Sequence, residues 1–131
     1  MRALIPLVLI STAATAAAPP AGAPQERLDR AIAGKVAGAP ISCISLPRAG
    51  SSEIIDETAI IYRQSRSRLV VNRIPGGCPG LTRNRAFATR TPGTRLCRGD
   101  IITVFDPRAQ IPYGSCALGD FVPYEAPRRA P

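Results

Sequence analysis

The chain of 131 residues has no histidine and no tryptophan, and only 5% of its residues are aromatic. Histidine is the most frequent general acid or base near neutral pH, so its absence removes the usual centre of acid–base catalysis. With few aromatic rings, the chain also lacks the platforms on which proteins stack the bases of single-stranded nucleic acid. We therefore expect no histidine-based catalysis and no nucleic-acid partner.

A long hydrophobic run is also missing. The apolar stretch after Arg2, residues 3–10, is too short for a spanning helix, which needs about 20 apolar residues. Small residues follow it, and the whole pattern is typical of a secretory signal peptide. We expect residues 1–16 to be this signal peptide, cut after Ala16 or, as a second choice, after Ala17. The mature protein is then expected to be periplasmic or secreted.

Four cysteines, Cys43, Cys78, Cys97 and Cys116, are the only ones in the chain. In a short exported protein, an even number of cysteines indicates disulfides. Zinc ligands normally come in close pairs, whereas these cysteines are 35, 19 and 19 residues apart. We therefore expect two disulfides, with no metal site and no cofactor, and three connectivities are open.

The chain is expected to have three parts after the signal peptide. Residues 17–39 are a Pro/Ala-rich linker with a short helix over residues 25–34, in which Leu28 belongs to the apolar side. Residues 40–124 form one small β domain, and residues 125–131 form a disordered tail.

Strands are expected throughout the β domain, because β-branched residues occur there in short runs bounded by Gly, Pro, Asp and Ser. No sustained helical period follows residue 40. The expected strands cover residues 41–46, 53–55, 59–63, 68–74, 86–90, 94–97, 100–105 and 115–122. The predicted fold is all-β, a small antiparallel sheet or an open barrel that two disulfides staple, with a short N-terminal helix.

Positive charge is the main functional signal. The net charge is +8, and sixteen of the seventeen basic residues are arginine. Nine arginines lie between residues 63 and 98, where there is no acidic residue: Arg63, Arg66, Arg68, Arg73, Arg83, Arg85, Arg90, Arg95 and Arg98. On neighbouring strands and loops they would form a positive face.

Arginine suits carboxylates and phosphates, because its planar guanidinium donates two parallel hydrogen bonds. The expected partner is an anionic envelope polymer, a lipid head group or an acidic protein. The alternative is a solvated surface without a partner, since charge runs are usually solvated and a coding sequence rich in G and C also produces many arginines. Both interpretations remain open.

Asp56 and Glu57 are adjacent carboxylates between two expected strands. They are the candidates for an enzyme or inhibitor of unfamiliar type. The competing interpretation is a turn in which Asp56 hydrogen-bonds the backbone. Because consecutive side chains need not converge on a substrate, we favour the turn and a non-enzymatic protein.

Arg98-Gly99-Asp100 is the tripeptide that animal cell-adhesion receptors read in many extracellular ligands. A three-letter motif often arises by chance. Gly99 lies between two expected strands, where glycine can supply the positive φ of a tight turn or bulge. We interpret the tripeptide as a turn that Cys97 pins.

Five stretches carry a resemblance to a known family: CISL (43–46), IIDETAIIYR (54–63), VNRIPGGCPGL (71–81), RLCRGD (95–100) and GSCALG (114–119). Together they resemble small exported proteobacterial proteins, alphaproteobacterial-like and with four cysteines, that form a domain-of-unknown-function family. The resemblance covers residues 41–122 and implies no activity. It implies a nested disulfide pairing, in which Cys43 bonds Cys116 and Cys78 bonds Cys97.

Overall fold

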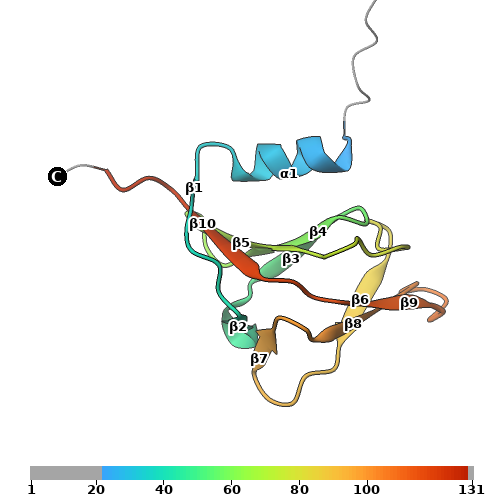
Figure 1. Cartoon of the computed structure of the whole chain (residues 1–131). Coiled ribbons are helices and arrows are strands. Elements are labelled where there is room, and N and C mark those ends of the chain that lie inside the picture. The colour runs from blue at the N-terminus through green and yellow to red at the C-terminus, as the bar shows by residue number, and fades with distance from the viewer. Residues whose placement is uncertain (1–21, 130–131) are drawn as a thin grey trace, which may run out of the picture.

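Antiparallel strands make up most of the structure, a computed structural model that describes residues 22–129 (Figure 1). The expected signal peptide, residues 1–16, lies outside the described residues. The elements are α1 Pro24–Ile32, β1 Val36–Ala37, β2 Cys43–Ser45, the 3-10 helix η1 Leu46–Arg48, β3 Ser51–Ile55, β4 Ala59–Arg63, β5 Arg68–Arg73, β6 Ala86–Thr89, β7 Arg95–Cys97, β8 Ile101–Phe105, β9 Pro112–Ala117 and β10 Phe121–Glu125.

The strands form three sheets. The largest has five strands in the order β1-β10-β5-β4-β3, and the other two have the orders β6-β8-β9 and β2-β7. Every strand pair in them is antiparallel. The predicted all-β fold with a short N-terminal helix and two disulfides is confirmed.

The helix α1 covers one face of the five-stranded sheet (Figure 1). Pro24 suits its first turn, where a backbone N–H would have no partner within the helix. Leu28 is fully buried there against Ile61 and Val71 of the two central strands. The apolar side of the predicted helix is therefore the side that docks. No helix among residues 22–129 is both long enough and apolar enough to cross a membrane.

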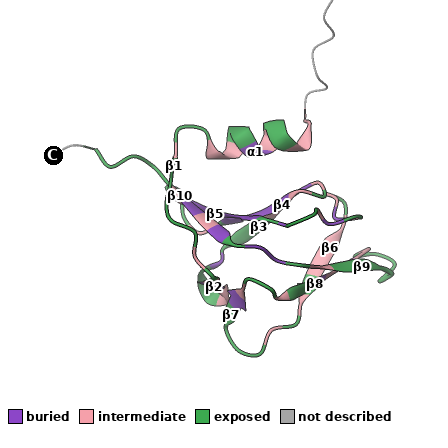
Figure 2. Ribbon diagram, viewed as in Figure 1, coloured by how far each residue is buried: buried purple, intermediate pink, exposed green. Residues whose placement is uncertain are grey.

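The opposite face of the five-stranded sheet packs against the two smaller sheets. Ile60 and Val70 point to this second core, which also contains Ile102 and Val104 of β8. Because β4 and β5 are covered on both faces, their side chains are almost all buried, as the continuous apolar runs indicate. Figure 2 shows this buried centre in purple between the helix and the smaller sheets.

The expected strand over residues 115–122 was wrong, because the chain turns there and forms β9 and β10 in two different sheets. The turn is held by the buried side chain of Asn72. Its Nδ2 donates to the Gly119 carbonyl at 2.8 Å, and its Oδ1 accepts from the Gly119 N–H at 3.0 Å. A Cβ at Gly119 would lie 2.5 Å from the Arg73 carbonyl oxygen, so only glycine fits.

The disulfide pairing that the resemblance implies, Cys43 with Cys116 and Cys78 with Cys97, was also wrong. Cys43 bonds Cys97, and Cys78 bonds Cys116. The nested pairing would require the strand of Cys43 to lie beside the strand of Cys116. Instead β2 pairs with β7, which places Cys43 directly opposite Cys97, and β9 carries Cys116 in another sheet.

Candidate anion-binding groove

The nine arginines of the 63–98 segment lie on several parts of the fold. Arg63, Arg66 and Arg68 lie at the β4–β5 hairpin, Arg73 ends β5, Arg83 and Arg85 precede β6, Arg90 and Arg95 lie at the ends of the β6–β7 loop, and Arg98 lies in the β7–β8 turn. The segment therefore supplies charge to several edges of the domain.

Other elements supply the carboxylates that this segment lacks. Four of the nine arginines form ion pairs in this way: Arg63 with Glu53, Arg68 with Glu125, Arg83 with Asp56 and Arg98 with Asp120. Within the described part of the chain, the other five have no ion pair: Arg66, Arg73, Arg85, Arg90 and Arg95. Charge counted along the sequence thus overstates the unpaired charge on the surface.

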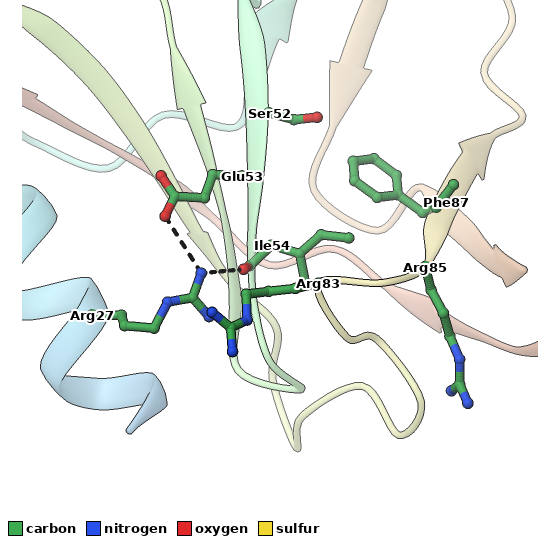
Figure 3. Close-up of a pocket in the computed structure, with 8 residues that line it drawn as sticks. Arg27, Ser52, Glu53, Ile54, Arg83, Arg85 and Phe87 are labelled. Atoms are coloured by element: carbon green, nitrogen blue, oxygen red, sulfur yellow. Dashed lines mark hydrogen bonds and ion pairs between the residues drawn. The ribbon is translucent and has the colours of Figure 1, made fainter. Parts of the chain in front are cut away.

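Three of the nine arginines gather with two from α1 along the terminal strand β3. Two hollows of about 430 and 300 Å³ adjoin there and share Arg27 and Glu53. We term them together the β3 groove, and its charged lining is Arg27, Arg30, Glu53, Arg63, Arg83 and Arg85. Ile54 and Phe87 form an apolar wall in the larger hollow, which lies between β3 and β6 (Figure 3).

Arg27 is the fixed centre of the groove, with only 12% of its side chain exposed. Its Nη2 donates to the Ile54 carbonyl at 3.2 Å and lies 3.5 Å from Glu53 Oε1 (Figure 3). Its Nη1 lies 3.7 Å from Asp56 Oδ2. This guanidinium therefore ties α1 to β3 and to the turn that follows β3.

The two carboxylates next to Arg27 each contact a second arginine. Glu53 Oε2 accepts from Arg63 Nη2 at 2.8 Å, and Asp56 Oδ2 lies 3.8 Å from Arg83 Nε. The result is a continuous chain of alternating charges along β3.

Arg85 plays a different part, because its guanidinium points away from Arg27 and Arg83 (Figure 3). It stacks on the Tyr113 ring, 3.5 Å from the ring centroid, and its Nη1 donates to the Gly80 carbonyl at 2.6 Å. A Cβ at Gly80 would lie 2.8 Å from that Nη1. Arg85 therefore braces the loop before β6 and lines the groove mainly with its stem.

The remaining groove charges are unevenly balanced. Besides Arg85, the lining contains four arginines, and three carboxylates pair with them: Glu53, Asp56 and Glu26. Glu26 pairs with Arg30 at 2.9 Å. One positive charge is therefore in excess. Arg30 and Arg83 are the most open, with 65% and 62% of their side chains exposed. Such exposed ion pairs contribute at most about 1 kcal/mol, so an anionic ligand can replace their carboxylates.

Asp56 and Glu57 lie in a turn at residues 56–58, in which the Thr58 N–H donates to the Ile55 carbonyl at 2.9 Å. Asp56 Oδ1 accepts from the Arg83 N–H at 2.9 Å, and Glu57 Oε1 accepts from the Gly80 N–H at 3.1 Å. Both carboxylates therefore bind the backbone of the loop before β6 and help to place Arg83.

The tripeptide Arg98-Gly99-Asp100 forms the predicted turn. Gly99 has a φ of 88°, and the Asp100 N–H donates to the Cys97 carbonyl at 3.0 Å. The Asp100 carboxylate accepts from the Cys97 N–H at 2.7 Å, and Arg98 pairs with Asp120 at 2.9 Å. Both charged side chains of the tripeptide are thus engaged within the domain.

Another hollow, of about 480 Å³, lies beside Asp106 and Arg108. Asp106 Oδ1 accepts from the N–H groups of Ala109 and Arg108 at 3.0 and 2.7 Å. These two hydrogen bonds lower the pKa of the Asp106 carboxyl below its usual value. The carboxylate therefore serves its own turn.

Sequence reasoning missed three charged residues of the groove, Glu53 and the two helix residues Arg27 and Arg30. The spacing of three residues between Arg27 and Arg30 places them close together on a helix, and this signal was available once the helix was predicted. Among the described residues, no three Cys, Asp or Glu side chains gather as metal ligands would. In comparisons with known proteins, no family model, no curated protein and no solved structure matches the chain.

Proposed function

We propose that this is an exported, non-enzymatic protein that binds an anionic component of the cell envelope, or an acidic protein, through the β3 groove. We further propose that it belongs to the family of small exported proteins with four cysteines that its sequence resembles. Two disulfides support the exported location, because disulfides persist mainly in oxidising compartments.

The observation that carries the proposal is the arrangement of Arg27, Arg30 and Arg83. Arg27 is fixed by three groups of β3 and its turn, while Arg30 and Arg83 are largely exposed in the hollows that share it. A ligand with several anionic groups can contact Arg30 and Arg83 without moving the buried guanidinium.

The roles of Asp56 and Glu57 favour binding over catalysis. Each carboxylate already accepts a backbone N–H, and Asp56 also faces two arginines. These contacts hold both carboxylates against the loop before β6, so neither side chain is free to approach a substrate. The enzyme or inhibitor alternative therefore has the weaker support.

Retention on immobilised heparin, a soluble polyanion, tests the proposal with a matched pair of variants. Arg83→Gln removes a groove charge, whereas Arg90→Gln removes an equal charge from an exposed residue outside the groove. We expect Arg83→Gln to elute at clearly lower salt and to bind about fivefold more weakly, a loss of roughly 1 kcal/mol. We expect Arg90→Gln to behave almost like the wild type.

Equal shifts for the two variants would mean that binding follows net charge alone, and the groove assignment would then be wrong. If the wild-type protein passes through the column without retention, anion binding itself is contradicted.

A further inference from the structure

We infer that the ligand of the β3 groove is an acidic protein segment in extended conformation, which pairs with β3 as an added strand. This inference rests on the proposed function and names its ligand class. Strand addition at an open sheet edge draws its affinity from main-chain hydrogen bonds and its specificity from alternate side chains.

The first step is that β3 has an open edge. It is the last strand in the order β1-β10-β5-β4-β3, so only β4 pairs with it among the described strands. The larger hollow of the β3 groove lies along this edge and separates it from β6, the terminal strand of another sheet. Unpaired backbone groups on such an edge are a template for a further strand.

The second step is the direction of the backbone groups. The Ile54 carbonyl accepts from Arg27 and therefore faces away from β4. In an antiparallel pair, alternate residues direct their N–H and C=O groups to the same side, so those of Ser52 share this direction. Ser52 also lines the larger hollow. The N–H of Ile54 and both backbone groups of Ser52 are therefore placed to pair with an incoming strand.

The third step is the chemistry on either side of the edge. Glu53 points toward α1, where it meets Arg27 and Arg63. Ile54 packs on the opposite side, against the same core as Phe87. Side chains of an added strand would alternate in the same way. Acidic residues would then face the arginines, and apolar residues would face the wall of Ile54 and Phe87. This charge complementarity selects an acidic segment of alternating pattern as the occupant.

The test uses the intact disulfide-bonded protein and a fluorescein-labelled peptide of alternating Glu and Val, with binding followed by fluorescence anisotropy. Two analogues carry N-methyl groups on every Val or on every Glu, which blocks pairing along one edge of the peptide at unchanged charge. We expect one analogue to bind like the parent peptide and the other about tenfold more weakly.

If both analogues bind like the parent, the groove binds charge without strand pairing, and the inference is overturned while the proposed function survives. If the parent peptide does not bind but heparin retention still depends on Arg83, the ligand is a different polyanion and the inference is again overturned. Loss of both would contradict the proposed function as well.

A matched pair of protein variants tests the same edge from the other side. Ser52→Pro removes the N–H that faces the groove, whereas Ser52→Ala retains it. We expect Ser52→Pro to weaken peptide binding about tenfold and Ser52→Ala to bind the peptide like the wild type. Normal peptide binding by a folded Ser52→Pro would overturn the inference. If this variant fails to fold, binding of the two N-methylated peptides to the wild-type protein still tests the inference.

Discussion

Two buried polar side chains, those of Asn72 and Tyr62, differ in whether their polar groups have hydrogen-bond partners. Asn72 is fully buried, and its amide satisfies both backbone groups of Gly119. Tyr62 is also buried, but within the described structure its hydroxyl has no hydrogen-bond partner. Burial raises the pKa of this hydroxyl well above its usual value, so it stays neutral at any physiological pH.

These two residues give contrasting expectations for stability. Tyr62→Phe removes an unsatisfied hydroxyl, so its free energy of unfolding should equal or exceed that of the wild type, within about 1 kcal/mol. Asn72→Leu leaves the buried groups of Gly119 unpaired and should cost roughly 2 to 3 kcal/mol. Urea unfolding under non-reducing conditions measures both. A large destabilisation by Tyr62→Phe would show that the hydroxyl has a partner and would contradict this account of the core.

The sequence predicted the local roles of individual residues better than their distant contacts. Gly99 was correctly assigned to a turn, because turn chemistry depends on neighbours in the chain. Asp56 also lies in a turn, but its carboxylate accepts from the Arg83 N–H, 27 residues away, and the predicted hydrogen bond to the backbone of its own turn was wrong. The role of Asn72 was not predictable in this way, since its partner Gly119 is 47 residues away. For the same reason, the strand expected across residues 115–122 was wrong.

At the scale of elements, the β7–β8 turn depends on the backbone of Gly99. Its φ of 88° lies in the left-handed region, yet a Cβ there would meet no atom within 4 Å. Gly99→Ala should therefore destabilise the protein through backbone strain alone, by about 1 to 2 kcal/mol. Gly99→Asn should recover part of this loss, because asparagine tolerates the left-handed region.

Thermal unfolding of the oxidised protein measures the effect of these Gly99 variants. An unchanged melting temperature for Gly99→Ala would mean that the turn does not need a left-handed residue. The same turn engages both charged side chains of the tripeptide, since the Asp100 carboxylate accepts from the Cys97 N–H and Arg98 pairs with Asp120.

Element pairing also explains the error in the disulfides. Apart from the strand expected over residues 115–122, the predicted strands were found close to their places, but sequence alone does not say which strands are neighbours. The pairing of β2 with β7 puts Cys43 opposite Cys97. Cys116 lies on β9 in a different sheet from Cys43, and it bonds the one remaining cysteine, Cys78.

For the whole molecule, the proposed binding surface lies where three elements from distant parts of the chain meet. Docking of α1 brings Arg27 to Glu53, 26 residues away, and the turn after β3 brings Asp56 to Arg83. The arginine count between residues 63 and 98 predicted a positive surface and included three of the groove arginines. It could not predict the carboxylates that neutralise much of it, because they lie outside the segment.

The measurement that tests the central claim most directly is nuclear magnetic resonance of the labelled oxidised protein during titration with a heparin-derived oligosaccharide. The account predicts that the signals that move belong to the β3 groove, above all the guanidinium groups of Arg30 and Arg83. Changes centred on Arg90 and Arg95, or spread evenly over all exposed arginines, would contradict it.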